Sequence, residues 1–349
     1  ERLKALDSDA EVTSFGQEIN PSTYAIAKAD MLIKGGNPEN MKLGDTLADD
    51  KFKNYTFDYI ISNPPFGINW KKSQDAVNKE HKQGDEGRFG IGLPSVSDGQ
   101  MLFTLNGIKK LKDTGKMAII HNASPLFAGE AGQGPSEIRR YIIENDWLDA
   151  IVQLSTDAFY NTAIPTYIWI ISKDKASHRE GKVQLIDASK CFEKRRKSIG
   201  NKKNDITEKC REMIIKAYGE FDNKSYSLDN GIACESKIFD NIEFGYNKIV
   251  IETPEVDEDG NIVRKGKKIV VDTKKRDTEN VPLDQDIECY FEKEVKPYNE
   301  IAFIDKNKTK VGYEIPFMRY FYRYIQPENL VNIENRISNL ENNIMSSLK

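Results

Sequence analysis

The chain has 349 residues, of which 38% are hydrophobic and 30% are charged, and its formal net charge is −4. This composition predicts one large or two ordinary globular domains, and no apolar run reaches the roughly 20 residues that span a bilayer, which argues against a membrane protein. A protein that grips DNA alone usually has a basic balance, so a DNA-binding role would need a local basic surface or a second subunit.

The first residues, from Glu1 to Lys4, contain neither the apolar core of a signal peptide nor an initiator methionine. We therefore expect a fragment of a longer, cytoplasmic protein. The four cysteines are widely spaced and form no CxxC pair: Cys191, Cys210, Cys234 and Cys289. With only three histidines beside them, they predict reduced thiols rather than a zinc site or a disulfide framework, and we expect no metal.

The first half of the chain alternates predicted strands and helices. Strands are predicted at residues 12–16, 41–43, 57–61, 117–120, 148–154, 167–171 and 183–186, and helices at 21–33, 98–112 and 136–145. The continuous apolar run at 117–120 is typical of a parallel strand that is covered on both faces. This alternation predicts a doubly wound α/β domain over residues 1–187.

Two glycine-bearing stretches interrupt this pattern. Residues 70–98 are polar and have no apolar period, so we expect a long loop that is functional or disordered. Residues 129–134, GEAGQG, superficially look like a phosphate-binding loop. Their spacing does not match a P-loop and no Lys-Ser/Thr pair follows, which favours a mobile surface loop.

The chain changes character after about residue 188. Residues 190–203 hold seven basic residues against one acidic residue, Glu193. Such a run predicts either a solvated, partly disordered helix or a surface that contacts phosphates, and the sequence leaves both open. Residues 247–253 and 267–272 are predicted to form a hairpin around the turn at 257–261.

The end of the chain predicts two helices, at residues 284–295 and 329–348. Ile333, Ile337, Leu340 and Ile344 are spaced 4, 3 and 4 residues apart, which is a heptad seam. A seam of about three heptads is marginal alone in water, so it needs a partner, either within the chain or in another subunit. We divide the rest of the chain into a region at 188–326, with the basic segment and the hairpin, and an amphipathic helix for subunit contact at 327–349.

The tetrapeptide Asn63-Pro64-Pro65-Phe66 follows the apolar strand at 57–61, which we expect to be buried. Ligands of open α/β sheets bind at the carboxyl ends of strands. An exocyclic aryl amine is a poor nucleophile because its lone pair is delocalised into the ring. Acceptors at Asn63 and Pro64 would favour the tetrahedral amine, and the prolines would fix both acceptors. Phe66 offers a flat face to an extruded base, although a rigid turn explains the same residues.

Acidic residues end the two strands that precede this one. Glu18, followed by Ile19, can hold a ribose diol or simply flank a helix. Asp45, followed by Thr46, can accept from an adenine amino group or form an Asx-turn. Glu, Asp and Asn at three successive strand ends fit an adenosyl cofactor beside an amine substrate.

Together these segments resemble the modification (M) subunit of type I restriction–modification systems. The resemblance rests on residues 15–35, 42–47 and 57–70, on Leu126-Phe127, and on residues 159–166, 286–297 and 312–317, and it is weakest at 187–285. It implies a Rossmann-like methyltransferase fold, S-adenosyl-L-methionine as methyl donor and adenine N6 in double-stranded DNA as acceptor. It also implies cofactor contacts at Glu18, Ile19, Asp45, Thr46 and Asn63, and a catalytic loop at Asn63, Pro64, Pro65 and Phe66.

The resemblance further implies a complex of two M subunits, one specificity (S) subunit that reads the DNA sequence and a restriction (R) subunit. Such partners would explain the acidic net charge and would give the heptad seam a binding partner. The family's glycine-rich cofactor loop, its first strand and its N-terminal helical domain have no counterpart ahead of Glu18. We therefore expect the longer protein to be active and this fragment alone to bind cofactor weakly.

Two alternatives stay open. The same tetrapeptide suits RNA adenines or glutamine side-chain amides, and the chain could instead be a non-catalytic assembly or DNA-clamping module. The sequence contains no P-loop motif and no convincing nuclease carboxylate cluster, so translocation and cleavage are not expected of it.

Overall fold

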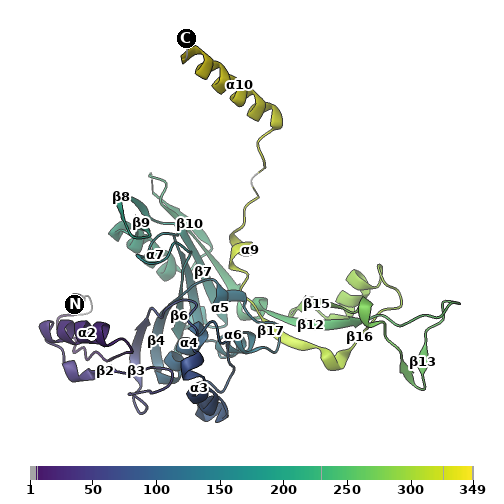
Figure 1. The fold of residues 1–349 in the computed structure, drawn as a ribbon, viewed down its shortest axis with the longest axis horizontal. Helices are drawn as coiled ribbons and strands as arrows, with labels where there is room; N and C mark the ends of the chain where they lie inside the picture. The colour runs from purple at the N-terminus through teal and green to yellow at the C-terminus, as the bar shows by residue number, and fades with distance from the viewer. Residues whose placement is uncertain (1–4, 6, 229, 325, 348–349) are drawn as a thin grey trace. The chain divides into compact units, whose positions relative to one another are not determined.

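Seven strands form the central sheet, in the order β10–β11–β7–β5–β6–β4–β3 (Figure 1). The structure is a computed structural model that describes residue 5 and residues 7–228, 230–324 and 326–347. The strands are β3 (Phe57–Ser62), β4 (Leu111–His121), β5 (Leu148–Leu154), β6 (Tyr167–Ser172), β7 (Lys182–Lys190), β10 (Lys224–Ser227) and β11 (Ala233–Asp240). Five of them run in one direction, and β6 and β11 run in the other. The predicted α/β class is confirmed.

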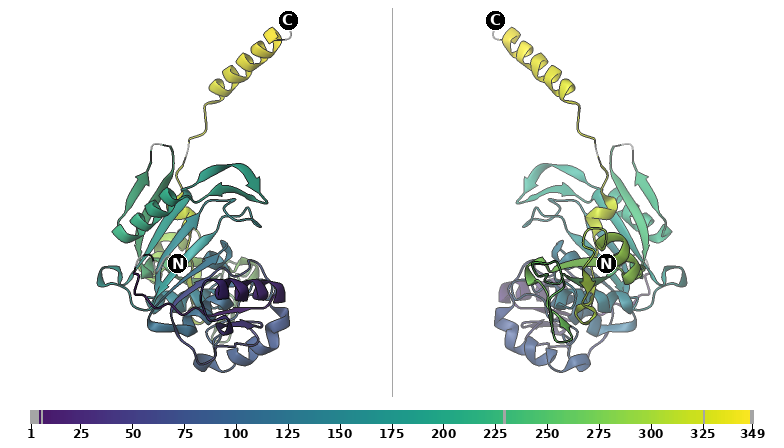
Figure 2. Two further views of the ribbon diagram at one scale, coloured as in Figure 1. Left: turned by 90° about the vertical axis from the view of Figure 1, so that its left-hand side faces the viewer. Right: turned by 90° about the vertical axis from the view of Figure 1, so that its right-hand side faces the viewer.

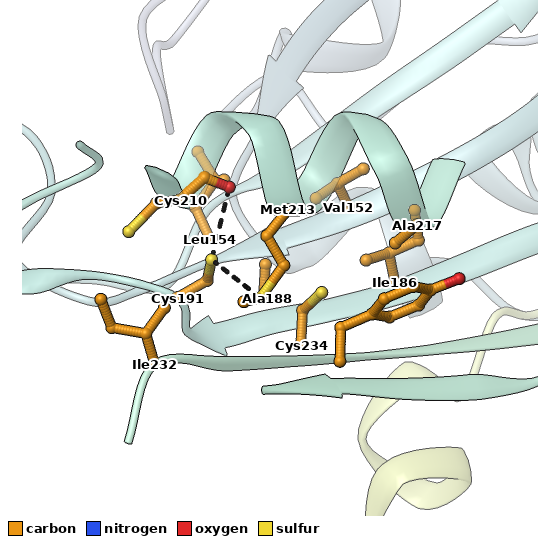
Figure 3. Close-up of a cluster of buried hydrophobic side chains, with 11 residues drawn as sticks. Val152, Leu154, Ile186, Ala188, Cys191, Cys210, Met213, Ala217, Ile232 and Cys234 are labelled. Atoms are coloured by element: carbon orange, nitrogen blue, oxygen red, sulfur yellow. Dashed lines mark hydrogen bonds between the residues drawn. The ribbon is translucent and has the colours of Figure 1, made fainter. Parts of the chain in front are cut away.

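Both faces of this sheet are covered at its centre. The longest described helices beside it are α4 (Gln100–Lys110), α6 (Gly134–Glu144) and α7 (Glu208–Glu220). Val152, Leu154 and Ile186 pack in one core cluster with side chains of α7 (Figure 3). Because side chains alternate along a strand, Ile151 and Leu185 point to the opposite face, and they are fully buried as well. This double burial explains why these strands are continuous apolar runs.

The N-terminal strands form a small sheet of their own. β1 (Gly16–Glu18) pairs in parallel with β2 (Met41–Leu43), and α2 (Pro21–Ile33) connects them. The Asn20 side chain caps α2 by accepting from the backbone amides of Ser22 and Thr23. The strand predicted at 12–16 was misplaced. Phe15 instead packs against the rings of Phe52, Tyr55 and Phe57, and this packing attaches the small sheet to β3.

The expectation that residues 57–61 form a buried strand was wrong. Within the described part of the chain β3 pairs only with β4, so it is an edge strand. Tyr59 is 69% exposed and Ile61 is 89% exposed. The apolar composition predicted burial, but nothing in the described residues covers this edge.

Residues 70–98 form an ordered segment rather than a loop without structure. They contain α3 (Gln74–His81) and short 3-10 turns at Lys71–Ser73 and Gly84–Glu86. The helix predicted at 98–112 is shorter at both ends, because Gly99 is the N-cap of α4 and Leu111 already pairs with Phe57 of β3. Tertiary pairing at Leu111 therefore decided where the helix gives way to the strand.

The basic run at 190–203 forms a β-hairpin, not a helix. β8 (Glu193–Ile199) and β9 (Lys202–Asp205) are antiparallel, and Ile199 faces Lys202 across the turn Gly200-Asn201. Gly200 has a φ of +59°, which a two-residue hairpin turn requires. That Gly-Asn pair was the signal in the sequence that predicted the hairpin.

A second sheet follows the central one in the chain. It comprises β12 (Gly245–Glu252), β15 (Asp277–Pro282), β16 (Phe303–Ile304) and β17 (Lys310–Tyr313). The predicted turn at 257–261 is present, but its predicted strands were paired wrongly, because β12 pairs with β15. Residues between them form the smaller hairpin of β13 (Arg264–Lys265) and β14 (Lys268–Ile269). The helix predicted at 284–295 is α8 (Ile287–Tyr290) followed by a π-helical turn at Phe291–Val295.

Residues from Pro316 onward form a separate unit with α9 (Phe317–Phe321) and α10 (Leu330–Ser347). The predicted terminal helix is confirmed, apart from Leu348, which lies outside the described residues. No described residue of α10 is buried. The domain boundaries predicted at 187 and 326 stay predictions. No helix in the described ranges is both long enough and apolar enough to cross a membrane.

Candidate active site

Asn63 and Pro64 begin the loop that leaves the carboxyl end of β3. Pro64 is buried, Asn63 and Pro65 are exposed, and Phe66 is half-buried. Neither the Asn63 side chain nor the Pro64 carbonyl has a hydrogen-bond partner within the described residues. A buried proline thus fixes the loop while two adjacent acceptors remain available to a ligand.

Trp70 closes this loop on its downstream side. Its backbone amide donates to the Val96 carbonyl at 3.0 Å, and its indole Nε1 donates to the Ser95 carbonyl at 2.9 Å. The amide of Gly99 donates to the Ile68 carbonyl at 3.0 Å. Because Trp70 is only 3% exposed, the segment 70–98 is packed back onto the base of the catalytic loop. Sequence reasoning missed Trp70, although a lone tryptophan in a polar stretch was a visible signal.

Glu18 lies at the carboxyl end of β1, beside the loop that follows β2. The register pairs Glu18 with Leu43, and the Gly44 amide donates to the Glu18 carbonyl at 3.0 Å. Its Oε1 accepts from the Asn20 amide at 2.7 Å, which leaves Oε2 without a partner in the described residues. An unpartnered carboxylate oxygen at a strand end fits the hydroxyls of a ribose. Ile19, the next residue, is exposed.

Asp45 is more committed to the protein than Glu18 is. Its Oδ1 accepts from the Leu47 amide at 2.9 Å, which is the Asx-turn that the sequence allowed, and its Oδ2 accepts from the Ser73 hydroxyl at 2.5 Å. Each carboxylate oxygen has a second lone pair. Contact with an adenine amino group therefore stays a prediction, limited to those remaining positions.

Arg88 fixes the same loop from behind. Its guanidinium donates to the backbone carbonyls of Thr46 at 2.7 Å and Leu47 at 3.0 Å. It also pairs with Glu80 and donates to the Asn106 side chain. The side chain of Arg88 is buried, so this network links α3 and α4 to the predicted cofactor loop. No pattern in the sequence singled out Arg88.

A second buried arginine, Arg139 of α6, joins the two sheets. Its Nε donates to the Tyr313 carbonyl at 2.6 Å, and its other nitrogens donate to the carbonyls of Pro125, Ala128 and Gly129. Burial lowers the pKa of Arg139 to about 10, so it stays charged at neutral pH. The GEAGQG segment, predicted as a mobile surface loop, is thus tied to α6 by its first carbonyl.

His121, at the carboxyl end of β4, is the titratable side chain nearest in the sheet to the loop of Asn63. Its Nε2 shares a 2.8 Å hydrogen bond with the Thr104 hydroxyl, and burial lowers its pKa to about 3. It is therefore neutral and occupied with a neighbour, which does not suit a general base. Nowhere in the described ranges do three or more His, Cys, Asp or Glu side chains come close enough to hold a metal ion.

The family model described as N-6 DNA Methylase matches residues 2–258. The chain belongs to the N-6 DNA methylase family. This match spans both small strands with Glu18 and Asp45, the Asn63 loop and the β8–β9 hairpin. It confirms, at the level of the family, the resemblance that the sequence motifs indicated.

Relatives of this N-6 DNA methylase are subunits of type I restriction enzymes. The MjaIX methylase subunit of Methanocaldococcus jannaschii is 27% identical over 86% of this chain and 49% of its own length. The HindI methylase subunit of Haemophilus influenzae is 29% identical over 51% of this chain and 38% of its own. The chain therefore spans half or less of the length of these relatives.

A solved structure supports the fold of this N-6 DNA methylase. The methyltransferase subunit of a type I restriction–modification system from Streptococcus thermophilus is 30% identical, with a TM-score of 0.54. The match covers 67% of this chain and 46% of that one. The expected methyltransferase-type α/β fold is confirmed.

Proposed function

We propose that the protein transfers the methyl group of S-adenosyl-L-methionine to N6 of adenine in DNA, as the modification subunit of a type I restriction–modification complex. The observation that carries this proposal is the pair of unengaged acceptors, at Asn63 and Pro64, on a fixed loop at a strand end. Family membership and the names of the relatives support the same chemistry.

The loop residues divide the work of activating the amine. The Asn63 side-chain oxygen and the Pro64 carbonyl accept the two amine hydrogens, which favours the tetrahedral nitrogen and frees its lone pair. Phe66 holds the extruded base by stacking. The proton leaves after the nitrogen has become cationic, so no strong base is needed, and a neutral His121 is consistent with that.

The loops after β1 and β2 form the cofactor side of the proposed site. Bound S-adenosylmethionine supplies an electrophilic methyl group on a positively charged sulfur. Glu18 binds the ribose through its unpartnered oxygen, with Ile19 beside it. Asp45 and Thr46 line the adenine end, where Ser73 and Arg88 hold the loop.

The test is methyl transfer by the longer protein assembled with its specificity subunit. Unmethylated duplex DNA made by amplification is incubated with labelled cofactor, and N6-methyladenine is quantified by mass spectrometry. The proposal expects label in DNA adenine. Label in RNA or in glutamine amides, with none in DNA, would instead support the alternative acceptors. A folded complex that binds DNA and labels nothing would support the non-catalytic module.

The predicted partners are the S subunit, a second M subunit and the R subunit, and the α10 seam is the proposed contact. Ile337, Leu340 and Ile344 are all more than half exposed. Adding two charges on the seam, as I337E/L340E, should abolish co-purification with the other subunits because each carboxylate would be desolvated in an apolar contact. N339E/N342E adds the same charge off the seam and should co-purify normally. Equal behaviour of both variants would contradict the contact.

A further inference from the structure

The β8–β9 hairpin concentrates positive charge that the proposed chemistry does not use. Arg195 pairs with both oxygens of Asp205 at 2.7 Å, and Lys202 approaches the same carboxylate at 3.2 Å. The side chains of three further basic residues are exposed and have no ion-pair or hydrogen-bond partner within the described residues: Lys194, Arg196 and Lys197. In a chain with a net charge of −4, these three cations form a local basic surface.

Both ends of the hairpin are anchored in the core. Cys191, just before β8, is buried against Cys210 and Met213 of α7 (Figure 3). Burial raises the pKa of the Cys191 thiol, so it stays an uncharged packing group. In β9, the Asn204 side chain donates to the Thr156 carbonyl at 2.9 Å and is itself buried. The exposed cations therefore stand on a fixed base, which lowers the conformational entropy lost when they bind a ligand.

The hairpin packs on the loop that follows β5. The amides of Lys203 and Asn204 donate to the Asp157 carbonyl, and the amide of Asn201 donates to the Tyr160 carbonyl at 2.9 Å. The Lys202 ammonium lies 5.2 Å from the centroid of the Tyr160 ring. Figure 2 shows the hairpin standing out from the sheet. The hairpin is thus held at the carboxyl end of β5.

That end of β5 lies on the same edge of the sheet as the catalytic loop. β5 and β3 run in the same direction, with β6 and β4 between them. Three strand spacings of about 4.8 Å place the two strand ends about 14 Å apart across the sheet. A duplex rises about 3.4 Å per base pair along each strand, so this separation corresponds to about four base pairs.

We propose that the β8–β9 hairpin binds the phosphate backbone of duplex DNA a few base pairs from the extruded adenine, through Lys194, Arg196 and Lys197. This inference rests on the proposed DNA methylation. Contacts to phosphates hold the duplex in position without reading its sequence, which leaves sequence readout to another subunit. The hairpin also explains how a chain of acidic net charge contributes to gripping DNA.

The test compares two triple variants that remove equal charge. K194Q/R196Q/K197Q neutralises the hairpin, and K265Q/K267Q/K268Q neutralises three exposed lysines on the β13–β14 hairpin. The longer protein, in the assembly that binds DNA, is titrated with labelled duplex by fluorescence anisotropy at several salt concentrations. Methyl transfer is followed in parallel, and thermal unfolding shows whether each variant is folded. If the triple variant is unstable, R196Q alone replaces it.

Losing three phosphate contacts should reduce the slope of log K against log salt by about 2.7, and losing one by about 0.9. We expect the hairpin variant to bind DNA at least tenfold more weakly, with a raised KM for DNA and an unchanged kcat at saturating DNA. The β13–β14 variant should stay within twofold of the unmodified protein. An unchanged slope in the hairpin variant, or an equal loss in both variants, overturns the proposal.

The two proposals fail in distinguishable ways. Hairpin-dependent DNA binding without methyl transfer would refute the methylation and keep the hairpin contact. Methyl transfer with a salt slope that ignores the hairpin would refute the hairpin contact alone.

Discussion

The loop after β3 and the loop after β2 lie at strand ends of the same fold but differ in how they are held. At Asn63 and Pro64, polar groups face outward without internal partners. At Asp45, Thr46 and Leu47, nearly every polar group is already bound, by Ser73 or by Arg88. The first loop presents chemistry to a ligand, whereas the second has its shape fixed by the protein. Substitutions in the two loops should therefore affect different measurements.

The largest effect is expected at the open loop. Asn63→Ala removes one of two acceptors that stabilise the reacting amine, and loss of one such preorganised group typically costs about 100- to 1,000-fold in kcat. Cofactor affinity should not change, because the side chain binds the acceptor base. Labelled methyl transfer and calorimetric cofactor titration measure the two quantities. Asn54→Ala, at another exposed asparagine, is the control, and activity within tenfold of normal at Asn63→Ala would contradict its role.

The fixed loop should respond first in stability. Arg88→Met leaves Glu80 and the carbonyls of Thr46 and Leu47 without their buried donor, which should destabilise the protein by about 3 kcal/mol. Cofactor binding should weaken with it, because the loop loses its support. Thermal unfolding with and without cofactor measures both. Arg140→Met breaks only an exposed pair with Glu144 and should change stability by less than about 1 kcal/mol.

Glu18 lies between these extremes, with one oxygen bound and one available. Glu18→Gln should weaken cofactor binding about tenfold, since a charged hydrogen bond is worth about 1.5–3 kcal/mol, and should leave folding unchanged. Isothermal titration gives the affinity, with Glu39→Gln on the exposed turn before β2 as the matched control. Equal affinities for all three proteins would end the ribose assignment.

The smallest effect is expected at Ser73. Ser73→Ala removes the hydroxyl that donates to Asp45 Oδ2, a hydrogen bond worth about 1 kcal/mol, so cofactor affinity should fall about fivefold. The freed oxygen stays available to the ligand, which limits the loss. A KM for cofactor compared between this variant and Ser97→Ala checks it. An unchanged KM would show that the position of Asp45 does not depend on Ser73.

Several parts of this molecule followed from the sequence alone. The apolar runs of β4 and β5 are recognisable because these strands are buried on both faces. The cap at Asn20 and Pro21 predicted where α2 begins, since capping is decided within four residues. The strand-end order Glu18, Asp45, Asn63 predicted a site because parallel strands bring such residues to one edge. These features depend on local patterns or on periodicity, which a sequence displays directly.

Other parts depended on contacts between distant residues. Nothing near Arg88 or Arg139 in the sequence shows which carbonyls they bind, because those carbonyls come from loops up to 174 residues away. The exposure of Ile61 could not be predicted either, since an edge strand and a central strand have the same apolar composition. The basic run gave charge without shape, and the Gly200 turn together with the loop after β5 decided that it forms a hairpin at the edge of the site. The sequence by itself determined which chemical groups end each strand, whereas only the tertiary structure decided which of those groups remain free to meet a ligand, because freedom is set by the neighbours that folding supplies.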